Sequence, residues 1–172
     1  MTAKTRINAS RRNFLMGAVR RVRGKEAVAE PVAATGDTVP LLDRANTHFA
    51  AKEFEQAVDA YREYLKREKQ DMDVRVRLGR SLYALGKYTA ARLEFKRVLK
   101  VRPKDSQACV YAGLCFARCA RLEEAARVWE DFFDLKNVEL LRELNIQKGL
   151  ILSGDAGHHD AVAEAVEAVL DA

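Results

Sequence analysis

A repeat with a period of 34 residues limits the folds open to this chain more than any other feature of its sequence. Six columns of related residues recur in phase, three times each, with no insertion between them. The columns are Ala45, Gly79 and Gly113; Lys52, Gly86 and Ala120; Phe54, Tyr88 and Leu122; Ala57, Ala91 and Ala125; Tyr61, Phe95 and Trp129; and Tyr64, Val98 and Phe132. A fixed period of this length indicates stacked supersecondary units. The sequence therefore predicts three repeats, near residues 38–71, 72–105 and 106–137.

Each repeat has the pattern of two helices joined by a short turn. In the middle repeat, apolar periodicity predicts helices over residues 74–84 and 88–101. Pro103 ends the second helix because proline cannot continue one. The columns of alanine and glycine let antiparallel helices approach closely, and the aromatic column fills the gap to the next repeat. No single pair can bury its apolar face alone, so the pairs are expected to stack.

The middle repeat carries Leu78-Gly79, Gly86, Tyr88, Ala91, Phe95 and Pro103 in this order. This pattern resembles the tetratricopeptide repeat family, and the resemblance extends over residues 38–137. It implies an all-α fold, a right-handed superhelical stack of antiparallel helix pairs with three repeats and a C-terminal capping helix pair. The outer repeats depart from the pattern, since Lys69 and Asn137 replace the closing proline and Ala120 replaces the turn glycine.

The period ends at Asn137, and residues 138–172 are expected to form a degenerate fourth helix pair that caps the open stack. A contact with a partner or a second copy is the alternative role for this pair. A helix is predicted over residues 138–152, followed by a loop over 153–159 and a last helix capped by Asp160. His158 and His159 are interpreted as exposed loop residues, with a metal site as the alternative.

The positive charge of the chain is concentrated at its N-terminus. The net charge is +5, but residues 1–30 hold eight basic and two acidic residues, so the remainder is close to neutral. This distribution weakens a nucleic-acid role for the whole chain. We expect a basic arm over residues 1–26, an extended linker over 27–40, the repeats over 41–137 and the cap over 138–172.

The arm begins with a segment, residues 10–15, that resembles the opening of a twin-arginine export signal. The apolar stretch that follows is only five residues long, so cleaved export is not expected. An amphipathic basic helix that docks on an anionic membrane or an acidic partner is the first interpretation, and a solvated arm is the alternative. The residues that would make the contact are Arg11, Arg12, Phe14, Leu15, Arg20, Arg21 and Arg23.

The resemblance also implies a concave groove, lined by the first helices of the repeats, that binds a peptide or a partner helix. The candidate lining residues are Asn46, Phe49, Val76, Arg77, Arg80, Tyr83, Leu114 and Arg118. This mixture of apolar, aromatic and arginine side chains suits an apolar segment that bears a carboxylate. Leu42 stands where family members that grip chaperone C-termini begin a two-carboxylate clamp with lysine, so a chaperone co-factor role is not expected. Ordinary packing between repeats is the alternative role for these residues.

No motif for catalysis, phosphate binding, a cofactor or a metal is found. The predicted function is a non-catalytic adaptor or scaffold that binds another protein, with acidic groups of that partner in the groove. The alternative is an accessory subunit or assembly factor of a membrane-associated redox complex, motivated by the twin-arginine-like segment. Nucleic acid is the weakest alternative and rests on the basic arm together with the basic middle repeat, which has ten basic and three acidic residues.

The three cysteines are crowded into residues 109–119 and lack the spaced pairs of a secreted protein. They indicate packed small residues in a reducing compartment, with metal binding and redox sensing as the alternatives. The expected location is the cytoplasm, peripheral to the inner face of the membrane where the arm docks.

Overall fold

A computed structural model describes residues 38–170 of the 172-residue chain. The predicted basic arm, its twin-arginine-like segment and most of the predicted linker lie outside these residues. Within the described range, eight α-helices and no strand are present. They are α2 (Val39–Ala50), α3 (Phe54–Arg67), α4 (Met72–Ala84), α5 (Tyr88–Val101), α6 (Ser106–Arg118), α7 (Leu122–Glu130), α8 (Val138–Ser153) and α9 (His159–Leu170). None of the helices in this range is long and apolar enough to cross a membrane.

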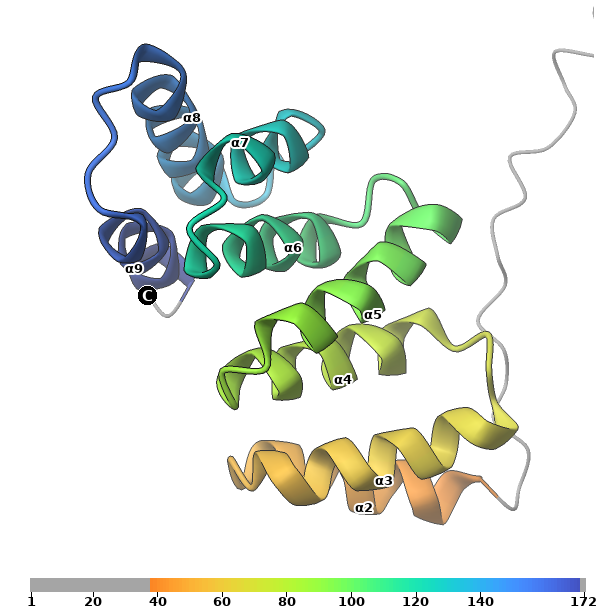
Figure 1. Cartoon of the computed structure of the whole chain (residues 1–172). Coiled ribbons are helices and arrows are strands. Elements are labelled where there is room, and N and C mark those ends of the chain that lie inside the picture. The colour runs from red at the N-terminus through yellow and green to blue at the C-terminus, as the bar shows by residue number, and fades with distance from the viewer. Residues whose placement is uncertain (1–37, 171–172) are drawn as a thin grey trace, which may run out of the picture. The chain divides into compact units, whose positions relative to one another are not determined.

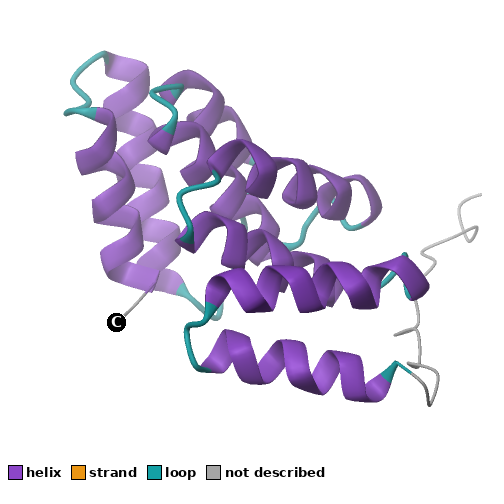
Figure 2. Ribbon diagram, turned by 60° about the horizontal axis from the view of Figure 1, so that its bottom comes forward, coloured by secondary structure: helices purple, strands orange, loops and turns teal. Residues whose placement is uncertain are grey.

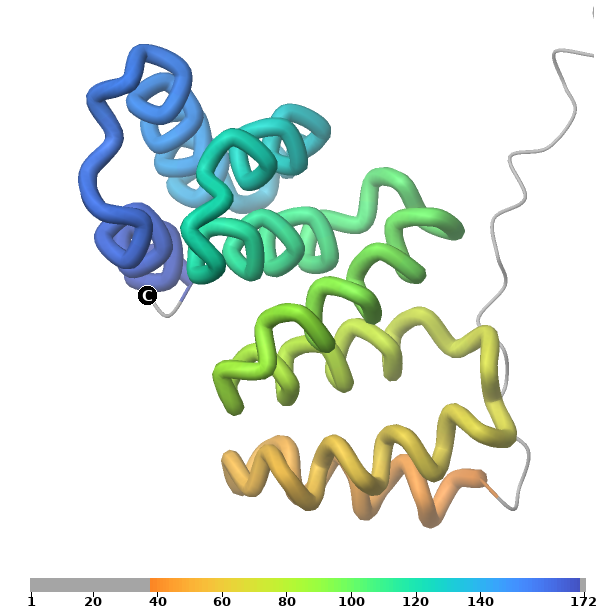
Figure 3. The backbone as a smooth tube through the Cα atoms, in the orientation of Figure 1, coloured from red at the N-terminus to blue at the C-terminus, as the bar shows by residue number. Residues whose placement is uncertain are grey.

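The first six helices form three antiparallel pairs, α2 with α3, α4 with α5, and α6 with α7 (Figure 1). The second helix of each pair also packs against the helix that follows it, so that α3 contacts α4 and α5 contacts α6. The tube view in Figure 3 shows this regular succession of helix, short turn and helix. The all-α prediction and the stack of helix pairs are confirmed, and the fold is an α-solenoid.

The turn column adopts the same backbone conformation in all three repeats. Lys52, Gly86 and Ala120 have φ angles of 61°, 69° and 57°, which lie in the left-handed region. In the middle turn, the Gly86 N–H donates to Tyr83 O at 2.9 Å and the Lys87 N–H donates to Leu82 O at 2.9 Å. This pair of bonds is the Schellman ending of a helix. The first and third repeats form the same bonds with non-glycine residues in the turn.

The small and aromatic columns pack directly against each other inside the middle and third repeats. Tyr61, Phe95 and Trp129 are fully buried. A Cβ atom built on Gly79 would lie 2.6 Å from Phe95 Cε1. The glycine therefore leaves the space that the ring occupies. Because the two residues contact each other, both positions recur with the 34-residue period.

The fourth pair departs from the arrangement of the repeats. Helix α8 begins after Asn137, whose side-chain Oδ1 accepts from the Leu140 N–H at 3.0 Å, and ends at Gly154 with a φ of 81°. It packs against α7, as the first helix of a further repeat would. Helix α9, by contrast, packs against both α8 and α6, the first helix of the third repeat (Figure 2). The last helix thus lies along the face on which the candidate groove was predicted.

Candidate partner-binding cleft

Side chains from the first helices and from α9 surround a cleft, here called the aromatic cleft. Its lining residues are Phe49, Ala50, Lys52, Phe54, Arg80, Tyr83, Ala84, Tyr88, Tyr111, Arg118, Glu167 and Leu170. A second hollow, here called the polar cleft, is lined by Asp73, Val76, Arg77, Arg80, Asp105, Ser106 and Gln107. Arg80 lines both, so its side chain is where the two clefts meet.

The Arg80 guanidinium lies between two aromatic rings. Its Cζ is 5.3 Å from the centroid of the Phe49 ring and 5.4 Å from that of the Tyr111 ring. Cation–π contacts of this kind hold the cation by its face and leave its N–H groups available at the edge. Within residues 38–170, Arg80 makes neither a hydrogen bond nor an ion pair. Arg75 in the same helix, by contrast, forms an ion pair with Glu94 at 2.7 Å.

Arg77 lies one turn before Arg80 and is held by a neutral group. Its Nη1 donates to Asn46 Oδ1 at 2.6 Å, and the Tyr61 hydroxyl donates to the same oxygen at 2.9 Å. Asn46 therefore orients Arg77 without neutralising its charge. The predicted residues Asn46, Arg77 and Arg80 thus form one connected surface across α2 and α4.

Aromatic rings in tilted, edge-to-face and stacked contacts build the wall of the cleft. The Tyr83 ring centroid is 5.2 Å from that of Tyr88 and 5.5 Å from that of Tyr111, and Tyr111 stacks on Phe95 at 5.7 Å. Such ring pairs add to the stability supplied by burial alone. The wall is consequently a rigid apolar surface that presents ring faces beside a cation.

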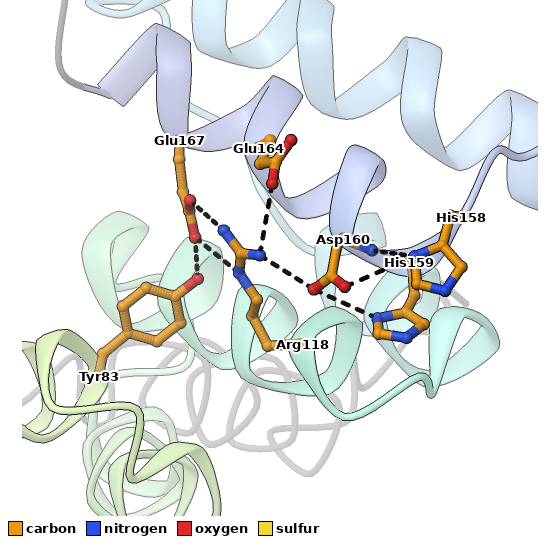
Figure 4. Close-up of polar contacts among 7 residues, drawn as sticks. All are labelled: Tyr83, Arg118, His158, His159, Asp160, Glu164 and Glu167. Atoms are coloured by element: carbon orange, nitrogen blue, oxygen red, sulfur yellow. Dashed lines mark hydrogen bonds and ion pairs between the residues drawn. The ribbon is translucent and has the colours of Figure 1, made fainter.

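The far end of the cleft is closed by a network that joins α4, α6 and α9 (Figure 4). Arg118 donates from Nη2 to Glu167 Oε2 at 2.5 Å, from Nε to Glu167 Oε1 at 3.2 Å, and from Nη1 to Asp160 Oδ1 at 3.0 Å. The Tyr83 hydroxyl also donates to Glu167. Arg118 was predicted to face a partner, but carboxylates of the chain's own last helix already bind it.

Ionisation in this network follows from burial and from these bonds. Burial first, and then the hydrogen bond to Glu167, raise the pKa of Tyr83 far above its usual value, so the phenol stays a neutral donor. The hydrogen bond with Glu167 is the main cause that raises the pKa of Arg118. The hydrogen bond from Arg118 lowers the pKa of Asp160 below 3.8. At neutral pH the network therefore contains a charged arginine bound to ionised Asp160.

Several predicted groove residues lie elsewhere than expected. Leu114 is fully buried and does not line either cleft, because α9 packs on that side of α6. Val76 is 5% exposed and reaches only the polar cleft. Asp160 does not cap α9 as predicted, since the helix begins at His159 and the carboxylate turns toward Arg118.

Sequence reasoning missed much of the lining. Tyr111 lies two helical turns before Arg118 on α6, and that spacing could have placed it on the same face. Glu167 and Leu170 lie outside the 34-residue period, and no pattern in the sequence associates them with the first helices. Their place in the cleft depends on where α9 packs.

The charges around the paired histidines disfavour a cation site there. Ligand atoms of His158, His159 and Asp160 lie within 4.8 Å of one another, and the centroids of the two tilted imidazole rings are 4.1 Å apart. The Asp160 carboxylate is bound by Arg118, whose positive charge opposes a cation at the same place. His158 is exposed as predicted, whereas His159 is the first residue of α9 rather than a loop residue.

The stacked pairs and their cleft define a helical-repeat protein of the kind that binds other proteins. Residues 48–109 match the family model of the tetratricopeptide repeat. The resemblance to the tetratricopeptide repeat family is thereby confirmed, and with it a general role in protein–protein interaction. Proteins of this family are typically scaffolds without enzymatic activity. Comparison with curated proteins gives no match.

Proposed function

We propose that the protein is a non-catalytic adaptor that binds an extended or helical segment of a partner in the aromatic cleft, and that Arg80 binds a carboxylate of that segment. The observation that carries this proposal is the position of Arg80, between the rings of Phe49 and Tyr111 and without a hydrogen bond to residues 38–170. A charge-assisted bond to carboxylate is among the strongest that an arginine side chain can make.

The surroundings of Arg80 favour a partner with both an apolar and an acidic side chain. The rings of Tyr83, Tyr88 and Tyr111 offer apolar area, and the contacts between these rings limit the entropy lost on binding. Arg77 adds a second positive charge on the polar side of Arg80. The carboxylates on this side are Asp73, which Arg102 binds, and Asp105, which accepts from the Ala108 N–H, so the two arginines are the cations left to bind the acidic end of the segment.

A selection from random peptides tests this function and needs no identified partner. A random linear peptide library displayed on phage is selected on the full chain, on Arg80→Gln and on Arg62→Gln. Arg62 is an exposed arginine of α3 that lines neither cleft, so it is the matched control for charge. We expect acidic residues beside an apolar residue to be enriched on the wild type and on Arg62→Gln, and this enrichment to be lost on Arg80→Gln. Equal pools from all three proteins would reject the proposed site.

The basic arm enters the proposal as a second contact, to a partner or to an anionic membrane surface. This part rests on the sequence of residues 1–26, which the described range does not include. Sedimentation with vesicles of phosphatidylserine and phosphatidylcholine tests it. The full chain should sediment with the anionic vesicles at low salt, whereas a variant lacking residues 1–30 should stay in the supernatant. Equal sedimentation of both proteins would remove the arm from the proposal.

A further inference from the structure

We propose that Glu167 fixes the direction in which a partner segment lies in the aromatic cleft. It does so by excluding a second carboxylate from the end of the cleft nearest Arg118. The partner segment would then place its acidic residue at Arg80 and an uncharged apolar residue between Tyr83 and Leu170. This inference rests on the proposed function, because it describes how the same cleft chooses among acidic segments.

The first support is the balance of charge along the cleft. The lining contains three cationic residues, Lys52, Arg80 and Arg118, and one carboxylate, Glu167. Arg118 is the cation that Glu167 and Asp160 bind, and its side chain is only 17% exposed. The Glu167 side chain is 27% exposed and forms part of the cleft surface. An incoming carboxylate at this end would therefore meet a negative group whose counter-charge is already bound.

The second support is that Glu167 is held in place from both sides. Arg118 binds both of its oxygens, and the Tyr83 hydroxyl donates to one of them. Its helix is anchored by Val162, Ala163 and Val166, which are 2%, 0% and 0% exposed. The backbone of Glu167 is therefore held beside the cleft, and a partner that displaced its carboxylate would have to break these three hydrogen bonds. Glu167 is thus a fixed part of the site.

The third support is the difference between the two ends of the cleft. At the end shared with the polar cleft, neither Arg80 nor Arg77 forms an ion pair within residues 38–170. Two carboxylates also line the polar cleft, but Asp73 is already bound by Arg102 and Asp105 accepts from the Ala108 N–H. At the other end, the half-buried Tyr83 donates its hydroxyl to Glu167, and the half-buried Leu170 lines the same cleft. Like charges placed opposite each other across an interface suppress binding of wrong partners. The cleft therefore accepts acid at one end and rejects it at the other.

Glu167→Gln tests this inference, because glutamine keeps an oxygen that can accept from Arg118 and Tyr83 but removes the charge. Glu164→Gln is the matched control, since Glu164 lies in the same helix, is 68% exposed, is 3.9 Å from Arg118 and does not line the cleft. Peptides are selected from the same library on the full-length wild type and on both variants. Peptides enriched on the wild type and on Glu164→Gln should contain one acidic residue with an apolar neighbour. Peptides enriched on Glu167→Gln should also include sequences with a second acidic residue in place of that apolar neighbour.

Affinities of two synthetic peptides give the quantitative result. One is the sequence most enriched on the wild type, and the other carries glutamate in place of its apolar residue. Fluorescence anisotropy should show that this replacement weakens binding to the wild type about tenfold more than binding to Glu167→Gln. An equal penalty in both proteins would overturn the role of Glu167 while the proposed function stood. Pools that do not depend on Arg80 would instead reject the proposed function, and this inference with it.

A second variant separates the charge of Glu167 from the hydrogen bond that it accepts from Tyr83. Tyr83→Phe removes the hydroxyl that donates to Glu167 but leaves the carboxylate and its bonds to Arg118. It should discriminate between the two peptides as the wild type does. If Tyr83→Phe lost the discrimination and Glu167→Gln kept it, the Tyr83 hydroxyl rather than the Glu167 charge would set the direction of the segment, and the inference would be wrong.

Discussion

Gly113 lies directly against the indole of Trp129, so close that a Cβ atom on the glycine would be 2.0 Å from Nε1 and 2.5 Å from Cε2. The ring is fully buried, and its Nε1 donates to Val110 O at 3.2 Å. The indole is thereby fixed on both sides, by packing and by a hydrogen bond. The missing side chain at residue 113 is what allows α6 and α7 to approach around the ring.

Gly113→Ala should therefore destabilise the protein despite the higher helix propensity of alanine. Overpacking of a well-packed core costs about 1–3 kcal/mol or more, whereas alanine in place of glycine in a helix gains about 1 kcal/mol. Since the indole or its helix has to shift to admit the methyl group, we expect a net loss of roughly 2 kcal/mol. Urea denaturation followed by circular dichroism measures it.

Gly149→Ala is the matched control for this prediction. Gly149 lies within α8, and a Cβ atom there would meet nothing within 4 Å. The same substitution should here stabilise the protein by about 0.5–1 kcal/mol, through helix propensity alone. If Gly113→Ala were as stable as Gly149→Ala, the packing of Gly113 against Trp129 would be wrong.

The repeat core was predictable from sequence because its spacing records direct contacts. Gly79 with Phe95 and Gly113 with Trp129 are the same contact in two repeats, so both members recur at 34 residues. The last helix, α9, has no equivalent in the repeats and packs on a different face, so its contacts produce no periodic pattern in the sequence. Leu114 was predicted to line the groove because its face of α6 was assumed to be open. Helix α9 covers that face, and sequence periodicity cannot indicate it.

Ala120→Gly should stabilise the protein, because Ala120 has a φ of 57° in a turn whose middle-repeat equivalent is Gly86. A residue with a Cβ atom in the left-handed region destabilises the folded state by about 1–2 kcal/mol, and glycine relieves this strain. Glycine also raises the conformational entropy of the unfolded chain, which offsets part of the stabilisation. We expect a net gain of about 0.5–1 kcal/mol in urea denaturation. Gly86→Ala should change stability in the opposite direction, and a loss of stability in Ala120→Gly would contradict the turn geometry.

Asp160→Asn should lower the melting temperature of the protein at neutral pH, and this difference from the wild type should disappear in acid. The bond from Arg118 lowers the pKa of Asp160 below its ordinary value of 3.8. A group with a lowered pKa in the folded state contributes stability above its unfolded pKa, and this contribution is lost as the pH falls through the folded pKa. The difference in melting temperature between wild type and variant should thus be constant from pH 7 to about pH 5 and shrink below pH 3.8.

Asp59→Asn is the control for this pH dependence, because Asp59 is exposed on α3 and makes no ion pair within residues 38–170. Its melting temperature should follow that of the wild type across the same range. A difference for Asp160→Asn that persisted unchanged at about pH 2 would show that the loss arises from packing of the side chain. The ion pair between Arg118 and α9 would then contribute nothing to stability.

One of the three cysteines should react rapidly with a thiol reagent in the native protein. All three were predicted to be packed, and this was wrong for Cys119, which is exposed after the end of α6. Burial raises the pKa of Cys109 and of Cys115 to about 12, so at about pH 8 almost none of either is thiolate, the reactive form. Titration with Ellman's reagent should release one equivalent quickly and two more only on unfolding. Cys119→Ser should abolish the fast phase alone, and two or more fast thiols in the wild type would mean that α6 is not buried between α5 and α7.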